Sequence, residues 1–463
     1  MSLPTEIRLS AFTDAATPVE ATLDAEARRW GVRGSMLRPQ RPLAPPAGPD
    51  PGDWRHPDVG YGVLLPDDDL VPVADRAVGA DAPAAVRHLL AERPGAVVLR
   101  YRPDLGTDRV ARYLPDGRRQ DLEVGVSVFG TGPGRIPRFV LVVGPPTQVP
   151  WTVQLSLNRR HFVGRLDLGE AGLERYVEAL LADWAGARPA AGEAVVWSTA
   201  HDAMTRTMDI TVAAQVQGAL ATDSEITVHR FAGPTATLDT LRTTLAERRP
   251  GLVVTSSHGM TAPLDDLDAM RATLGVPVDQ TLTGLDPAAL LEDWSPGGAV
   301  WVAQACCSAG SNLGTSYTGL LPAGSVADRV VAGVAALGPQ VSPLPRALLE
   351  ADPPLAAFVG HVEPTFDWTL VVPDTGQHVV TELVRGVYPR LFSRQPVGLA
   401  LAEYYAGVGA LYGKLSDARD DVDAEVEGAR ERATYYKLTA LDRESLVVLG
   451  DPTVMVGALP SQQ

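Results

Sequence analysis

From residue 193 onward, short apolar runs alternate with segments of helical pattern, and this alternation constrains the fold more than any other feature of the chain. Helical patterns cover 204–220 and 235–248, and a longer connection contains 286–294. The apolar runs, each expected to form a strand, are 193–200, 225–231, 250–259, 297–310, 353–362 and 445–452. Strands and helices that alternate at this spacing form right-handed βαβ units. The sequence therefore predicts an α/β fold whose mostly parallel sheet is flanked by helices.

The first 190 residues are patterned differently. The first 60 are expected to be irregular, and the proline-dense stretch 39–54 is expected to be an extended linker or surface loop. Strands are predicted at 60–66, 95–101, 121–130 and 138–144, followed by an amphipathic helix over 169–184. The small, proline-containing stretch 187–193 is the predicted boundary. We therefore expect an N-terminal subdomain of residues 1–190, α/β or β-rich and degenerate or regulatory, before a second domain of residues 191–463.

Composition excludes several classes of partner. The formal net charge is −16 and basic residues are scattered among acidic ones, so no nucleic-acid surface is expected. No apolar run approaches the roughly 18 residues that would span a membrane, and the first residues lack the pattern of a secretory signal. The two cysteines are adjacent, which argues against a disulfide scaffold. We therefore expect a cytoplasmic protein; abundant Ala, Arg, Gly and Pro are typical of a GC-rich bacterial genome.

No metal or other cofactor is expected. The eight histidines show no paired ligand spacing, and the cysteine doublet lacks the Cys-x-x-Cys step of zinc sites. The acidic stretch 417–433 lacks the pattern of a calcium loop, and we expect it to be a solvated charged helix.

Reactive side chains close two of the predicted strands. His258 ends one strand and the Cys306-Cys307 doublet ends the next. Carboxyl ends of parallel strands gather ligands and catalytic groups in open α/β sheets. A cysteine nucleophile needs a base for its proton, and Gly259 permits the close backbone approach that an oxyanion requires. Free cysteines are often core residues, but a histidine at the end of a neighbouring strand favours a cysteine hydrolase.

These motifs resemble a known group of enzymes. The stretches SSHG (256–259) and QACCSAG (304–310) resemble the clan of caspases, metacaspases, gingipains and bacterial CHAT proteases. Cys306 follows His258 by 48 residues, similar to the caspase interval of about 50. The stretches 138–151, 162–184 and 446–456 are similar to segments of gingipain-type peptidases. The resemblance covers roughly residues 138–456 and implies a caspase-like sheet.

The resemblance also implies roles for individual residues. His258 would be the general base, a cysteine the nucleophile, and the N–H groups of Gly259 and of the nucleophile the oxyanion hole. Cys306 fits the pattern Ala-Cys-x-Ser, whereas Cys307 has a glycine three residues later, as in metacaspases. The pattern favours Cys306 and leaves Cys307 as the alternative.

His361 is a rival base because it also closes an apolar strand, but valine rather than glycine follows it. We expect His361 either to line the substrate cleft with Glu363 and Trp368 or to be a structural histidine. Trp301 lies inside the cysteine strand and is expected in the core.

In this clan, the charge in the first specificity pocket selects the substrate residue. Asp202, in the loop after the first strand of the second domain, is the candidate for that charge, with Glu363 and Asp367 as alternates. An acidic pocket would select Arg or Lys. Asp202 is equally suited to cap a helix that begins near Met204.

Three functions remain open from the sequence. The first is a cysteine endopeptidase that cleaves proteins or peptides after Arg or Lys, which resembles bacterial defence or cell-death effectors switched on by a partner. The second is a catalytically silent interaction scaffold, which would have no need of both His258 and the cysteines. The third is a cysteine hydrolase that acts on a non-peptide substrate.

Overall fold

Buried apolar strands form the centre of the protein. The computed structural model describes residues 48–457 except 188, 318 and 372–380, together with residue 459 and the short strands at 6–9 and 19–22. Within these residues the largest sheet has 12 strands, in the order β12-β11-β13-β14-β17-β18-β10-β9-β3-β4-β5-β6. Most neighbouring pairs are parallel, so the predicted α/β class with a mostly parallel sheet is confirmed.

The strands of the second predicted domain lie close to the predicted positions. They are β11 (Ala190–Ser198), β12 (Thr227–Ala232), β13 (Pro250–Ser256), β14 (Val300–Gln304), β17 (Ala357–His361) and β18 (Leu446–Gly450). Every residue of β13, β14, β17 and β18 is buried. Such strands are covered on both faces, which explains why their sequences are continuous apolar runs rather than alternating ones.

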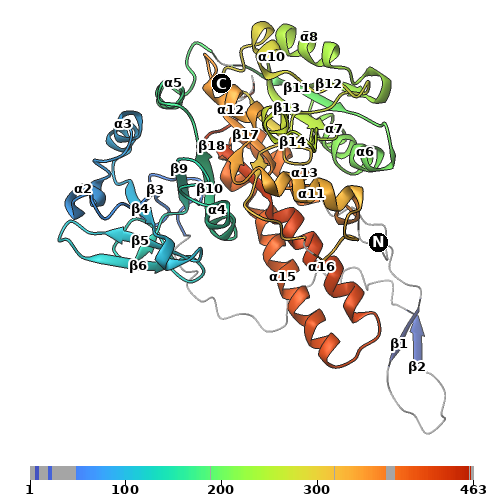
Figure 1. Ribbon diagram of the computed structural model, residues 1–463, viewed down its shortest axis with the longest axis horizontal. Helices are drawn as coiled ribbons and strands as arrows, with labels where there is room; N and C mark the ends of the chain where they lie inside the picture. Colours follow the sequence, from blue (N-terminus) through green and yellow to red (C-terminus); the bar gives the residue numbers. More distant parts are fainter. Residues whose placement is uncertain are drawn as a thin grey trace. The chain divides into compact units, whose positions relative to one another are not determined.

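The strands of the N-terminal half extend the same sheet. They are β3 (Tyr61–Pro66), β4 (Val97–Tyr101), β5 (Arg109–Tyr113), β6 (Arg119–Glu123), β9 (Phe139–Val143) and β10 (Phe162–Leu166). The strand predicted at 121–130 is instead β6 and a separate two-residue strand, β7 (Val128–Phe129). Figure 1 shows these strands on one side of β18 and the strands β11–β14 and β17 on the other.

The strand direction reverses at the middle of the sheet, between β17 and β18, and again at β5 and β6. β18 runs antiparallel to β17 but parallel to β10. β3, β4, β9 and β10 therefore run opposite to β11, β13, β14 and β17. As a consequence, the carboxyl ends of the two sets of parallel strands lie at opposite edges of the sheet.

Helices connect the strands and cover the sheet. Their bounds are α2 (Val73–Val78), α3 (Ala84–Glu92), α4 (Trp151–Asn158), α5 (Glu170–Leu181), α6 (Ala203–Met208), α7 (Ala214–Leu220), α8 (Leu238–Arg248), α9 (Leu267–Thr273), α10 (Pro287–Asp293), α11 (Val326–Ala336), α12 (Pro343–Glu350), α13 (Thr381–Arg385), α14 (Val397–Ala400), α15 (Ala402–Asp423) and α16 (Ala429–Glu444). A π-helical turn over Asp209–Ala213 joins α6 to α7, so the predicted helix at 204–220 is present with one irregular turn. Among the described residues, no helix combines the length and the apolar character needed to cross a membrane.

The two longest helices correct a prediction. α15 and α16 pack against each other, as Figure 1 shows, and the stretch 417–433 contains the end of one and the start of the other. The single charged helix predicted there is wrong. Glu425 and Gly428 both have positive φ, at 57° and 70°, and this left-handed backbone turns the chain between the helices.

Residues 1–48 and 49–463 form two separate compact units. In the first, β1 (Glu6–Leu9) pairs antiparallel with β2 (Val19–Thr22), so the prediction that the first 60 residues are irregular is wrong for these two strands. Residues 39–47 of the predicted proline-rich linker lie outside the described residues, and 48–54 form a loop. The division at residue 190 stays a prediction.

Candidate active site

The predicted base and nucleophile follow the ends of two neighbouring strands, β13 and β14. The two strands are parallel neighbours, and their last paired residues are Ser256 and Gln304. His258 and Cys306 each follow two residues after that pair. The same edge of the sheet therefore receives the imidazole from one strand and the first cysteine of the doublet from the next.

Asp202 holds the imidazole of His258. Its Oδ2 lies 2.8 Å from His258 Nε2, and its Oδ1 accepts hydrogen bonds of 2.9 Å from the Thr205 N–H and hydroxyl. The predicted helix cap is thus present, at the first turn of α6. Partial burial raises the pKa of Asp202, but the hydrogen bonds from Thr205 and His258 outweigh it and lower the pKa to about 2. The carboxylate therefore stays ionised. The other ring nitrogen of His258, Nδ1, has no hydrogen-bond partner among the described residues.

The two cysteines occupy different environments. Cys307 is completely buried and has a φ of 54°, and its side chain packs in an apolar cluster with Met270, Leu274, Val334 and Leu337. Cys306 is half-buried, and its Sγ accepts a hydrogen bond of 3.2 Å from the Thr365 N–H. The Thr365 hydroxyl lies 3.5 Å from the same sulfur. Burial raises the pKa of both thiols, opposed at Cys306 by the hydrogen bonds from Thr365.

Gly259 packs directly against the backbone of Cys306. A Cβ placed on Gly259 would lie 2.0 Å from the Cys306 carbonyl oxygen, so no residue with a side chain fits there without displacing the cysteine turn. Among the described residues, neither the Gly259 N–H nor the Cys306 N–H donates a hydrogen bond to another residue. Such unpaired backbone donors are rare in buried positions. The N–H groups of Gly259 and Cys306 are the two that the sequence resemblance assigns to an oxyanion hole.

His361 is built into the core. It is 3% exposed, and its ring nitrogens contact the Ser445 hydroxyl at 3.0 Å and the Gln304 side-chain oxygen at 3.3 Å. Burial lowers the pKa of His361 to about 4. Because both nitrogens are occupied, these contacts favour the structural role over that of a base. Trp301 is likewise buried, and its indole N–H donates to Thr255, as expected of a core residue.

The segment after β17 contributes an acidic group near the cysteines. Glu363 is half-buried, and its backbone carbonyl accepts a hydrogen bond from the Cys307 N–H. Burial raises the pKa of Glu363 to about 6, opposed by a hydrogen bond from Asn312. Asp367 is exposed at the start of a short 3₁₀ turn, and the side chain of Trp368 lies outside the described part of the chain.

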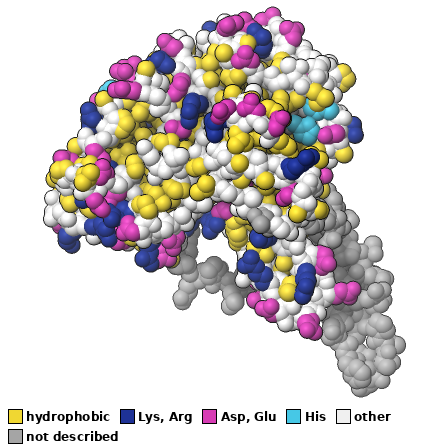
Figure 2. Space-filling view, viewed as in Figure 1, with side chains coloured by type: hydrophobic (Ala, Val, Ile, Leu, Met, Phe, Trp, Pro, Cys, Tyr) yellow, Lys and Arg dark blue, Asp and Glu magenta, His cyan; other side chains and the backbone are white. Residues whose placement is uncertain are grey.

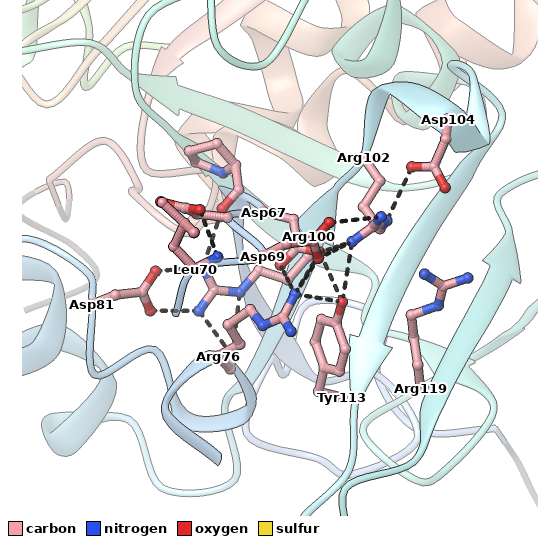
Figure 3. A network of polar contacts seen from close by, with 12 residues as sticks. Asp67, Asp69, Leu70, Arg76, Asp81, Arg100, Arg102, Asp104, Tyr113 and Arg119 are labelled. Atoms are coloured by element: carbon pink, nitrogen blue, oxygen red, sulfur yellow. Dashed lines mark hydrogen bonds and ion pairs between the residues drawn. The ribbon is translucent and has the colours of Figure 1, made fainter. Parts of the chain in front are cut away.

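In the N-terminal half, paired charged side chains cover the edge of the sheet at which the parallel strands β3 and β4 end. A polar network covers the carboxyl ends of β3 and β4, as Figure 3 shows. Asp67 and Asp69 each bind both Arg76 and Arg102, and Tyr113 donates a hydrogen bond to Asp67. The carboxylates and guanidinium groups pair with one another, although Arg76 Nε is buried without a hydrogen-bond partner among the described residues.

Two contacts of the site could not be predicted from the sequence. The ring of His201 stacks on that of His258, and the Thr365 backbone reaches the Cys306 sulfur. The position of His201 beside Asp202 in a strand-end loop was a signal for the first, whereas no motif marks Thr365. Within the described ranges, no group of three or more His, Cys, Asp or Glu side chains is arranged to hold a metal ion.

Surface charge is mixed on one face of the described part of the molecule. On the face drawn in Figure 2, Lys and Arg side chains lie among Asp and Glu side chains rather than in a patch of one sign.

Comparisons with known proteins give limited guidance. No family model matches the chain, and no curated protein matches its sequence. Among solved structures, the complex of Porphyromonas gingivalis RgpB pro- and mature domains is similar with a TM-score of 0.45 and 11% identity, over 86% of this chain and 80% of that one. A structure described as a protease is similar with a TM-score of 0.46 and 10% identity, over 85% and 78%. At such scores the functional argument rests on the residues of the site.

Proposed function

We propose that this protein is a cysteine peptidase in which Cys306 is the nucleophile, His258 the general base and Asp202 the group that orients the base. The observation that supports the proposal is that Asp202 pairs with His258, and that His258, Cys306 and two N–H groups without a hydrogen-bond partner among the described residues all follow the ends of the neighbouring strands β13 and β14. A catalytically silent scaffold would have no need of both His258 and the cysteines at this edge.

The proposed reaction begins with proton transfer from the Cys306 thiol to Nδ1 of His258. The Asp202 carboxylate accepts a hydrogen bond from Nε2–H and stabilises the imidazolium that forms. The thiolate then attacks the carbonyl carbon of the peptide bond, and the N–H groups of Gly259 and Cys306 bind the oxyanion. The protonated His258 gives its proton to the leaving amine, and water hydrolyses the thioester. When the substrate binds, the Cys306 sulfur would give up its contacts with the Thr365 N–H and hydroxyl and contact the substrate instead.

The cysteine doublet is assigned from burial and register. Cys307 is fully buried in an apolar cluster, whereas Cys306 packs against the same cluster but is only half-buried, and it follows the last residue pair of β13 and β14 by two residues, as His258 does. A nucleophile must be reached by its substrate. We therefore infer that Cys307 is a core residue.

The substrate is inferred to be a protein or peptide with Arg or Lys before the cleaved bond. Both oxygens of Asp202 are engaged, one by Thr205 and the other by His258, which favours Glu363 as the acid of the first specificity pocket. Glu363 is ionised above a pKa of about 6, so a basic side chain could pair with it at neutral pH. The expectation of an activating partner and of a role in bacterial defence or cell death rests on the sequence resemblance.

Hydrolysis of fluorogenic peptides tests the proposal. Wild type is expected to cleave peptides with Arg or Lys directly before the cleaved bond and not peptides with Asp there. Cys306→Ala and His258→Ala are expected to abolish cleavage, whereas His88→Ala, which changes an exposed histidine on α3, is the matched control. Cleavage that persists in Cys306→Ala would refute the assignment.

The acid of the pocket is tested separately. Glu363→Gln is expected to reduce kcat/KM for Arg and Lys peptides by more than about tenfold, because a buried charge pair is lost. If Asp367→Asn causes that loss instead, the exposed carboxylate and not Glu363 sets the preference.

A further inference from the structure

A second histidine lies against the face of His258. The rings of His201 and His258 are nearly parallel, with an angle of 11° between their planes and 5.5 Å between their centroids. The contact follows from the fold, because β11 and β13 are parallel neighbours whose paired residues Ser198 and Ser256 precede the two histidines. Since Asp202 is the next residue, one short loop contacts both the face and the edge of the same imidazole.

The ring of His201 is itself fixed from the other side. Its Nε2 lies 2.8 Å from the backbone carbonyl of Asp279, and because a carbonyl only accepts, Nε2 carries a hydrogen. Asp279 is 4% exposed, and its carboxylate accepts hydrogen bonds from the backbone of Leu238, Thr281 and Thr283. The neighbouring Val278 N–H donates to the backbone carbonyl of His258. The segment that contains Val278 and Asp279 therefore contacts both histidines and is itself fixed by hydrogen bonds.

The other ring nitrogen of His201 makes no hydrogen bond among the described residues. Nδ1 is buried there without a hydrogen-bond partner. A histidine placed only to anchor the loop would need one donor, which an amide side chain supplies equally well. The flat aromatic face is the property that the contact with His258 uses, because offset rings gain favourable dispersion and quadrupole energy.

We propose that His201 is a positioning residue for His258. Its face restricts rotation of the imidazole about the Cβ–Cγ bond, so that Nε2 stays on Asp202 and Nδ1 stays available for the thiol proton. The proposal rests on the proposed function of His258 as the base. It adds that the orientation of the base comes from two neighbouring residues, a carboxylate at the ring edge and an aromatic ring at its face.

Two matched variants separate stacking from anchoring. His201→Phe keeps the aromatic face and loses the hydrogen bond to the Asp279 carbonyl. His201→Gln keeps a donor for that carbonyl and loses the face. We expect His201→Phe to stay within about threefold of wild-type kcat on an arginyl peptide, and His201→Gln and His201→Ala to lose about tenfold in kcat with little change in KM. The reverse order, or three variants equal to wild type, would overturn the proposal.

A spectroscopic measurement keeps the proposal separate from the proposed function. In Cys306→Ala protein, ¹⁵N and ¹³C NMR of the imidazole reports the tautomer and mobility of His258 without any turnover. The proposal predicts a single ordered Nε2–H ring that becomes mobile in His201→Gln and stays ordered in His201→Phe. An unchanged His258 spectrum in His201→Gln would refute the stacking role. If wild type cleaves nothing while the NMR result is as expected, the proposed function fails and the positioning contact stands.

Discussion

Replacing Asp202 by asparagine separates the two tasks of this side chain. Oδ1 caps α6 through Thr205, and Oδ2 accepts from His258 Nε2 at 2.8 Å. In Asp202→Asn the amide oxygen can keep the cap. The amide nitrogen then faces Nε2–H, and because both are donors, the hydrogen bond that orients the imidazole is lost.

The effect on stability is expected to be small. Asparagine and aspartate are equivalent as N-cap residues, whereas alanine costs about 1 kcal/mol. The side chains of Asp202 and His258 are 51% and 37% exposed, so their ion pair contributes less than about 1 kcal/mol. Because the folded-state pKa of Asp202 is below its ordinary value of 3.8, the contribution is present above pH 3.8 and is lost as the pH falls through about 2.

The effect on activity is expected to be much larger. In a buried serine-protease triad, the equivalent change lowers kcat about 10⁴-fold. Asp202 is half-exposed, so water can partly replace it, and we expect a loss of about 100-fold, or about 2.7 kcal/mol of transition-state stabilisation.

The assay compares kcat/KM on an arginyl peptide with the free energy of unfolding in urea. Thr205→Val is the matched control, since it removes the hydroxyl contact to Asp202 but leaves the carboxylate beside His258. Asp202→Asn within about threefold of wild type would refute the orienting role. An equal loss in Thr205→Val would show that the effect passes through the helix cap.

Three further predictions concern stability and packing. The pKa of His361 falls from 6.5 to about 4 on folding, so the unfolded chain takes up the proton first, and the free energy of unfolding should fall by about 3 kcal/mol between pH 6.5 and 4; urea unfolding across that range should show a weaker pH dependence in His361→Gln. Asp451→Asn removes a buried carboxylate that binds Arg93 at 3.2 Å and should cost about 3 kcal/mol or more, whereas Asp116→Asn at an exposed pair should leave the urea unfolding curve almost unchanged; equal losses in urea unfolding would contradict this. Gly259→Ala places a methyl group against the Cys306 carbonyl and should abolish peptide cleavage, and an active Gly259→Ala enzyme would contradict the geometry.

The sequence predicted the strands that carry the site because their burial leaves a strong pattern. β13 and β14 are apolar up to Thr255-Ser256 and Gln304 at their ends, and His258 and Cys306 follow within two residues. Two parallel neighbours place their ends at one edge, so the position of His258 and Cys306 at the same edge followed from strand order.

Other features left no such pattern. A strand buried on both faces is apolar whether its neighbour is parallel or antiparallel, so the reversal between β17 and β18 was not predictable. The stacking of His201 depends on loop backbone and on the distant Asp279 carbonyl. The break between α15 and α16 was missed because charged residues continue through it while the backbone turns at Gly428.

The position of a covalent inhibitor adduct tests the assignment of Cys306 as nucleophile and His258 as base. The protein is incubated with an arginyl acyloxymethyl ketone, digested, and sequenced by tandem mass spectrometry. We expect an adduct on Cys306 in wild type and in Cys307→Ser. The rate of labelling should fall at least about 100-fold in His258→Ala. An adduct on Cys307, no adduct on either cysteine, or an equal rate in His258→Ala would contradict the assignment.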